Sequence, residues 1–271
     1  KGVKSMLKDI TIGQYIPGDS LIHLLDPRTK ILGAMAFILA LFIASGPEGY
    51  LILTLFSIII IILSRIPTSF VLRGLKPLYY ILAFTVLLNF FLTPGVEIWR
   101  WKFLRLTEEG LRQGLFMGWR LLLLVLTTSL LTLTSSPIAL TDGIERLLNP
   151  FKTIGVPAHE LAMMMTIALR FIPTLLEETD KIMKAQMARG AEFESGNIVQ
   201  RAKGMVPLLV PLFISAFRRA DELAMAMEAR CYRGGEGRTR MKQLEMKKRD
   251  YYALTLMGLL VIFAIYERLC L

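Results

Sequence analysis

Long apolar runs separated by short polar connectors fill the chain before Ser135 and again after Asp250. Each run carries almost no charge, which predicts helices that cross a membrane. The predicted membrane-spanning helices are Ile31–Ala44, Tyr50–Leu63, Leu78–Leu92, Leu121–Leu133 and Tyr251–Ile265. Because a membrane helix usually needs about 20 residues, we expect flanking residues to extend the shorter runs. The predicted fold class is therefore an all-α integral membrane protein with about five transmembrane helices plus long cytoplasmic helices.

The middle of the chain follows a different pattern and has no further run that reads as crossing a bilayer. Two long stretches of it repeat apolar residues at steps of three and four, which predicts two helices with one continuous apolar face each. Each stretch is apolar near its start and crowded with charge near its end. We expect both helices to lie under the membrane, because neither full exposure to water nor a membrane crossing suits both halves. Pro173, Pro207 and Pro211 should kink them.

These patterns divide the chain into three regions. Residues 1–135 form an N-terminal transmembrane region of four helices, residues 136–250 a set of cytoplasmic helices, and residues 251–271 a C-terminal transmembrane helix. Basic residues precede the first span and follow the second, which places the N-terminus in the cytoplasm. Five crossings then leave the C-terminus outside. The first residues lack the apolar core of a signal peptide, so we expect no cleaved leader.

Both long cytoplasmic helices end on the same small-arginine-small pattern. The first ends Ala188-Arg189-Gly190 and the second Ala229-Arg230-Cys231. A basic residue in the last turn and a following glycine are common helix-ending features, which would explain either ending alone. The pattern occurs twice, however, and the small neighbours leave each guanidinium accessible to pair with a carboxylate in a groove. We therefore predict that these ends bind other subunits.

Three glycines spaced four apart mark the segment before the fourth span. On a helix, Gly110, Gly114 and Gly118 form a smooth stripe that allows another helix to approach closely. The alternative is a glycine-rich loop. Just before them, Trp99-Arg100-Trp101-Lys102 suits an interfacial belt, where indole rings lie at the depth of the lipid headgroups.

Composition agrees with a membrane protein, since 54% of the residues are hydrophobic and the mean hydropathy is +0.52. The formal charge of +10 is compatible with nucleic-acid binding, but no stretch interleaves aromatic and basic residues on a polar face. We therefore predict no nucleic-acid partner. The chain has no GxxxxGK[ST] loop and no metal-ligand spacing, so we expect no bound cofactor or metal and no catalytic residue.

Several motifs together resemble the T component of energy-coupling factor transporters, the EcfT family, including its cobalt- and nickel-transport relatives. The motifs are Leu25-Asp26-Pro27-Arg28-Thr29-Lys30, Ala168-Leu-Arg-Phe-Ile-Pro173, Ala188-Arg189-Gly190, Pro207-Leu-Leu-Val-Pro211, Arg218-Arg219-Ala220-Asp221-Glu222 and Glu228-Ala-Arg-Cys-Tyr-Arg-Gly234. Cys231 departs from the family, which more often has glycine there.

The resemblance implies a non-catalytic scaffold in a prokaryotic cell membrane, whose arginine tips dock on two cytoplasmic ABC ATPases. These coupling helices would transmit ATP-driven motion to a substrate-binding S component for vitamin or micronutrient uptake. Contact with the S component and helix packing would involve Pro207 and Pro211 as well as the glycine stripe.

Three other functions are weighed against this one. A dedicated cobalt or nickel subunit of the same transporter class is the nearest alternative. An embedded enzyme is disfavoured because His23 and His159 stand alone, with His159 expected at a helix start or surface. A self-sufficient secondary transporter would carry ionisable groups at mid-membrane, which the first three spans lack.

Overall fold

The computed structural model describes residues 15–101, 104–191, 193, 198–235 and 244–270. They fall into two compact units. The first, called the bundle unit, comprises residues 15–144 with 244–270, and the second, called the helix-pair unit, comprises residues 145–235. The division lies inside a helix, α7 (Pro137–Leu148), rather than in a loop.

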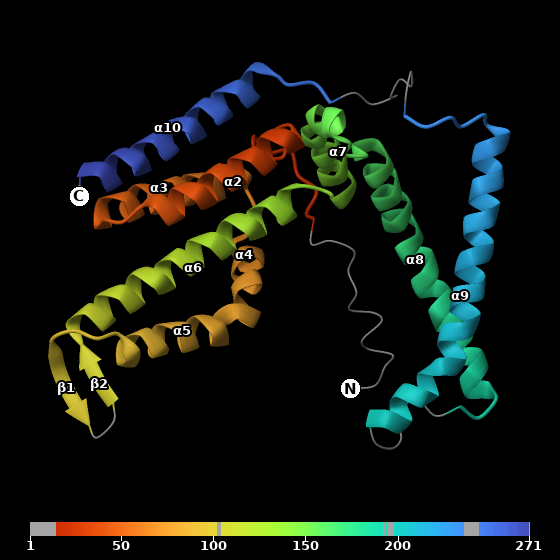
Figure 1. Cartoon of the computed structure of the whole chain (residues 1–271), viewed down its shortest axis with the longest axis horizontal. Coiled ribbons are helices and arrows are strands. Elements are labelled where there is room, and N and C mark those ends of the chain that lie inside the picture. Colours follow the sequence, from red (N-terminus) through yellow and green to blue (C-terminus); the bar gives the residue numbers. More distant parts are fainter. Residues whose placement is uncertain (1–14, 102–103, 192, 194–197, 236–243, 271) are drawn as a thin grey trace. The chain divides into compact units, whose positions relative to one another are not determined.

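The bundle unit is built almost entirely of helices (Figure 1). They are α2 (Pro27–Ile43), α3 (Pro47–Ser64), α4 (Thr68–Leu75), the short 3-10 helix η1 (Lys76–Leu78), α5 (Tyr79–Leu92), α6 (Glu108–Thr134) and α10 (Lys248–Cys270). A two-stranded antiparallel hairpin, β1 (Glu97–Trp101) with β2 (Leu104–Thr107), joins α5 to α6. The all-α fold class is confirmed, with this hairpin as its one described exception. The predicted interfacial belt of tryptophans falls on the hairpin, where it lies outside the described side chains.

Four helices of the described residues are long and apolar enough to cross a membrane, namely α3, α6, α8 (Ala158–Ala188) and α10. The apolar helix α5 is shorter, and the 17-residue α2 is not among the four. The sequence analysis found no crossing run between Thr134 and Asp250, whereas α8 has an apolar first half followed by a charged second half. Length and composition do not place α8 in a membrane, so the cytoplasmic location of residues 136–250 stays a prediction.

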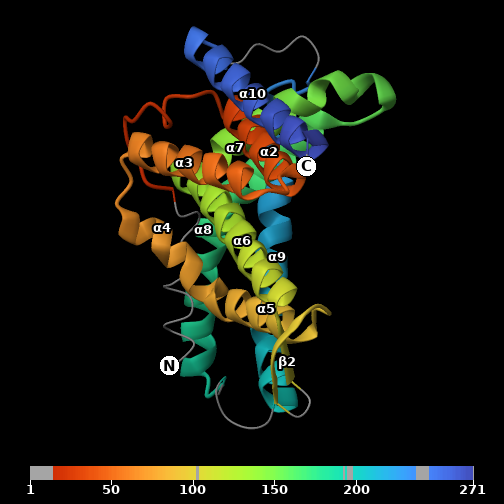
Figure 2. The ribbon, with the colours of Figure 1, turned by 90° about the vertical axis from the view of Figure 1, so that its left-hand side faces the viewer.

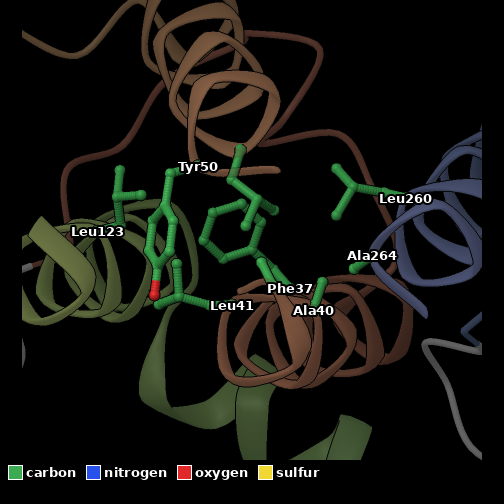
Figure 3. Close-up of a cluster of buried hydrophobic side chains, with 9 residues drawn as sticks. Phe37, Ala40, Leu41, Tyr50, Leu123, Leu260 and Ala264 are labelled. Carbon is green, nitrogen blue, oxygen red and sulfur yellow. The ribbon is translucent and has the colours of Figure 1, made fainter. Parts of the chain in front are cut away.

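The core of the bundle unit lies where α2, α3, α6 and α10 meet (Figure 3). Phe37 and Leu41 of α2 pack there against Tyr50 of α3, and Figure 3 shows Leu123 and Leu260 closing the cluster from α6 and α10. The outward faces of the same helices remain apolar. Exposed side chains of this kind include Leu51, Leu55, Ile62, Leu256 and Ile262. An apolar exterior around an apolar core is the pattern of a protein surrounded by lipid.

The glycine stripe lies on α6 and faces α5, which runs alongside it (Figure 2). A Cβ atom at Gly114 would come within 2.6 Å of the Phe90 ring, and one at Gly110 within 2.8 Å of the Asn89 carbonyl oxygen. A Cβ atom at Gly118 would come within 2.7 Å of Val86. The close approach of α5 and α6 therefore depends on the absence of side chains at these three positions.

Buried carboxylates hold both ends of α10. At its start, the Asp250 carboxylate accepts hydrogen bonds from the backbone N–H of Asp26 (2.7 Å) and of Lys247 (2.8 Å). At its other end, the Glu267 carboxylate accepts from the backbone N–H of Gly49 at 2.7 Å. Asp26 and Gly49 belong to the first turns of α2 and α3, where backbone N–H groups lack partners within the helix. The last helix therefore caps two earlier ones.

Arg120 lies on α6 beside the fourth predicted span and has its charge satisfied within the bundle. Its Nε donates to the Tyr50 hydroxyl at 2.8 Å, and its guanidinium lies 5.5 Å from the centre of the Phe42 ring. It also donates to the Ala44 carbonyl oxygen, at the end of α2 (3.4 Å). Hydrogen bonds and ring contacts of this kind make a charge tolerable close to an apolar span.

The helix-pair unit consists of the 3-10 helix η2 (Asn149–Ile154) followed by α8 and α9 (Ile198–Ala229), which pack against each other. Arg219 Nη2 of α9 donates to Glu178 Oε2 of α8 at 3.2 Å, so the charged halves of the two helices are paired. Pro173 lies inside α8, and both predicted α9 prolines lie inside that helix, which Figure 1 shows bent. The 31 residues of α8 correspond to about 46 Å of helix.

Candidate functional site

The first arginine tip is the end of α8, where backbone hydrogen bonds among the described residues close the helix. Arg189 is the C-cap, and the N–H of Gly190 donates to the Met187 carbonyl oxygen at 3.0 Å. The N–H of Ala191 reaches back to the Gln186 carbonyl oxygen at 3.0 Å. Gly190 has a φ of +87°, which glycine adopts without the steric penalty of a Cβ atom. This is a helix end closed by a left-handed residue.

The second tip, at the end of α9, repeats the first residue for residue. The N–H of Cys231 donates to the Glu228 carbonyl oxygen at 2.8 Å, and the N–H of Tyr232 to the Met227 carbonyl oxygen at 3.0 Å. Cys231 takes the left-handed position, with a φ of 54°. The sequence repeat around Arg189 and Arg230 is thus also a repeat of backbone geometry.

All six predicted docking residues are exposed. They are Ala188, Arg189, Gly190, Ala229, Arg230 and Cys231. Within the described part of the chain, neither guanidinium has a hydrogen-bond or ion-pair partner. Two unpaired cations, each at the end of a long helix and flanked by small residues, are positioned to enter a complementary acidic groove.

The two tips lie at opposite ends of the helix pair. Arg230 shares the lining of a pocket of about 360 Å³ with Met163 and Ile167, which belong to the first turns of α8. Arg189 lies at the far end of the same helix. The helices are therefore antiparallel, and two separate binding surfaces could be reached at once.

The predicted prolines lie in the apolar half of α9. Pro207 and Pro211 are flanked by exposed apolar side chains, the largest of which are Met205, Val206, Leu209, Val210, Phe213, Ile214 and Phe217. The glycine stripe is on α6, in the other unit, so the predicted S-component and packing residues do not form one cluster inside either unit. Among the described residues, no group of His, Cys, Asp and Glu could hold a metal ion.

Sequence reasoning missed one residue beside the second tip. His159 was expected at a helix start or surface, and it does lie in the first turn of α8, but its ring also contacts residues that follow Arg230. Its Nδ1 lies 3.1 Å from Glu145 Oε1, and its Nε2 lies 3.5 Å from the Tyr232 hydroxyl. The partners are far from His159 in the sequence and no spacing rule connects them.

Comparison with known proteins agrees with this architecture. The family model described as cobalt transport protein, CbiQ, matches residues 18–241. A protein of Clostridium kluyveri named energy-coupling factor transporter transmembrane protein EcfT is 59% identical over 266 residues, covering 97% of this chain and 98% of that protein. Proteins of the same name from Thermosediminibacter oceani and Bacillus subtilis are 63% identical over 262 residues and 53% identical over 246 residues. They cover 97% and 90% of this chain and 99% and 93% of their own lengths.

The chain belongs to the EcfT family. It is a transmembrane component of an energy-coupling factor transporter, as the motifs around both tips suggested. In this chain the repeated helix end is a feature of the helix-pair unit, and the apolar spans belong chiefly to the bundle unit.

Cys231 should be replaceable by glycine with a gain in local stability. A left-handed backbone costs a residue with a Cβ atom about 1 kcal/mol relative to glycine. We expect Cys231→Gly to slow hydrogen exchange at the amides of residues 231 and 232 by about five-fold, since 1 kcal/mol is roughly that factor. Cys231→Ala is the matched control, because it removes the thiol and keeps the strain. Equal exchange in the two variants would contradict the strain argument.

Proposed function

We propose that this chain is the scaffold and coupling subunit of an energy-coupling factor importer in a prokaryotic cell membrane. In this proposal, the Arg189 and Arg230 tips each dock on one of two cytoplasmic ABC ATPases. The observation that carries it is the pair of exposed, unpaired arginines on two helix ends of the same geometry. Two ATPase subunits bound at once would each need one such tip, which explains why the helix end occurs twice.

Docking through arginine follows from the chemistry of the guanidinium. Its planar fork of N–H donors matches a carboxylate with two parallel hydrogen bonds. Alanine before each arginine and a left-handed glycine or cysteine after it keep the approach open. Backbone hydrogen bonds close each tip, so its shape can persist while the arginine side chain is engaged.

Movement of the tips would be carried by α8 and α9 as levers. The Glu178–Arg219 ion pair joins their charged halves, so a displacement of one helix would also move the other. The exposed apolar side chains around Pro207 and Pro211 then offer a surface to a membrane-embedded S component, which would release a vitamin or another micronutrient inward. ATP and its magnesium ion would be held by the ATPases, with no cofactor on this chain and the N-terminus in the cytoplasm.

A dedicated cobalt or nickel transporter subunit remains a second candidate. The family model that matches this chain is described as a cobalt transport protein. The mechanical role of the tips would be the same, and only the substrate carried by the partner would differ.

Reconstitution tests whether this chain is a coupling subunit. Purified chain in liposomes should neither hydrolyse ATP nor take up solute, whereas addition of two energy-coupling factor ATPases and a riboflavin-binding S component should restore ATP-dependent riboflavin uptake. An isolated chain that transports or hydrolyses ATP would contradict the proposal. Liposomes with the ATPases and S component but without this chain are the control.

A further inference from the structure

The segment after the second tip turns back onto the start of α8 and packs on the ring of His159. A Cβ atom at Gly235 would lie 2.5 Å from Cδ2 and 2.6 Å from Cγ of that ring. No real Cβ atom comes so close, so the backbone lies on the imidazole at a distance that only glycine allows. Three residues earlier, the Tyr232 hydroxyl lies 3.5 Å from Nε2 of the same ring.

The imidazole also contacts a carboxylate. Its Nδ1 lies 3.1 Å from Glu145 Oε1, and the side chains of the pair are 32% and 13% exposed. With Nδ1–H donating to this carboxylate, Nε2 is left to accept from the Tyr232 hydroxyl. A ring that is oriented by a carboxylate cannot swing aside at no cost when the segment on its face changes.

We propose that His159 is a positioning residue for the second tip, a role that rests on the proposed docking function. The His159 ring supports the segment from Tyr232 to Gly235, and we call these contacts the seat. The seat sets the direction in which the Arg230 side chain projects from the end of α9. The tip itself is closed only by its own backbone hydrogen bonds, which fix its shape but not its direction. The contacts of His159 supply that direction by tying the segment to α7 through Glu145.

A positioning role differs from a merely stabilising one in what it changes. Reorienting a misdirected tip costs free energy and so weakens its binding to the ATPase. A higher ATPase concentration is then required to saturate the chain. Once docked, the tip is in the same place, and the maximal rate is unchanged. A general loss of folding would instead lower the amount of active complex and therefore the maximal rate.

A double-mutant cycle on the intact chain tests the seat. The variants are Gly235→Ala, His159→Ala and both together, and the measurement is uptake by reconstituted liposomes as the ATPase concentration is varied. We expect each single variant to raise the half-saturating ATPase concentration about five-fold without changing the maximal rate, which is the range for residues in direct contact. Adding Gly235→Ala to His159→Ala should raise it less than two-fold further, because the ring that opposes the new Cβ atom is gone.

Two controls separate the possible results. Gly258→Ala, where a Cβ atom would meet nothing within 4 Å, should leave the half-saturating concentration unchanged. Arg230→Glu should raise the half-saturating ATPase concentration strongly. If Arg230→Glu has no effect, the docking proposal fails. If it has its effect while the seat variants behave like the wild type, or if the two seat variants are additive, only the role of His159 is overturned.

Hydrogen exchange covers the case in which a variant fails to assemble with the ATPases. In the isolated chain, His159→Ala should speed exchange of the Tyr232 amide, which donates to the Met227 carbonyl oxygen, by about five-fold, with the amides of residues 189–191 at the first tip unchanged. Unchanged exchange at Tyr232 would overturn the seat directly.

Discussion

Reversing the charge at both tips, by Arg189→Glu together with Arg230→Glu, should abolish stable association with the ATPases. Each tip would present a carboxylate where a cation is needed, and breaking one desolvated charge pair costs about 2–5 kcal/mol. Both arginines are exposed and have no described partner within the chain, so the chain itself should fold normally. Each single variant should weaken binding, and the double variant should leave none measurable by co-purification.

The matched control reverses charges on the same helices away from the tips. Lys181→Glu on α8 and Arg218→Glu on α9 make the same change of charge at exposed positions. We expect co-purification and uptake close to wild type, because exposed charges contribute little on their own. A double tip variant that still recovers both ATPases would refute docking through these arginines. Equal loss in the control pair would show that overall charge, rather than the tips, matters.

Removing the buried carboxylate at the start of α10, by Asp250→Ala, should destabilise the bundle unit more than any other single truncation considered. The backbone N–H groups of Asp26 and Lys247 would lose their acceptor, and each buried unsatisfied donor costs about 1–3 kcal/mol. Lys30, which lies just before the apolar run of α2, would lose a counter-charge. Burial lowers the pKa of Lys30 to about 8, and Asp250 and Asp26 oppose that shift. At neutral pH the Lys30 ammonium is therefore still charged, and the two carboxylates stabilise that charge.

Thermal unfolding of the purified chain in detergent measures this loss. We expect Asp250→Ala to lower the midpoint by about 10 °C, since 1 kcal/mol corresponds to about 2–4 °C in a chain of this size. The midpoint of Asp250→Asn should lie between those of the wild type and Asp250→Ala, because the amide oxygen can still accept a hydrogen bond from the Asp26 N–H. The exposed Glu245→Ala serves as the control, with an expected change near zero. A midpoint equal to wild type for Asp250→Ala would remove the capping argument.

The membrane spans and the tips could be predicted because their signals are local. Apolar runs such as Tyr50–Leu63 are recognisable from composition alone, and α3 covers this run. The Ala-Arg repeat likewise lies within a few residues, and the backbone around Arg189 and Arg230 turned out to repeat as well. The docking role of these residues stays a prediction, as does the division of the chain into three regions.

The parts that could not be predicted depend on competing or distant signals. The hairpin lies in a stretch of mixed aromatic and charged residues, Glu97–Thr107. Apolar residues there follow neither the helical period of about 3.6 residues nor the strand period of about two. The apolar first half of α8 favours a membrane and its charged second half favours water, so the sequence pattern alone does not decide where this helix lies. The seat of Gly235 on His159 joins residues far apart in the chain, and no local pattern announces such a contact.

The capping of α2 and α3 by the last helix has a consequence for how the protein is made. The acceptors for the first turns of those helices, Asp250 and Glu267, are separated from their donors by 224 and 218 residues. In a nascent chain the Asp26 carboxylate can already accept from the Arg28 N–H at the start of α2, but the N–H groups of Asp26 and Gly49 lack their acceptors until α10 has been synthesised. Insertion of α10 is then the step that closes the bundle, and a translation product stopped before Lys248 would enter the membrane with these two N–H groups still unsatisfied.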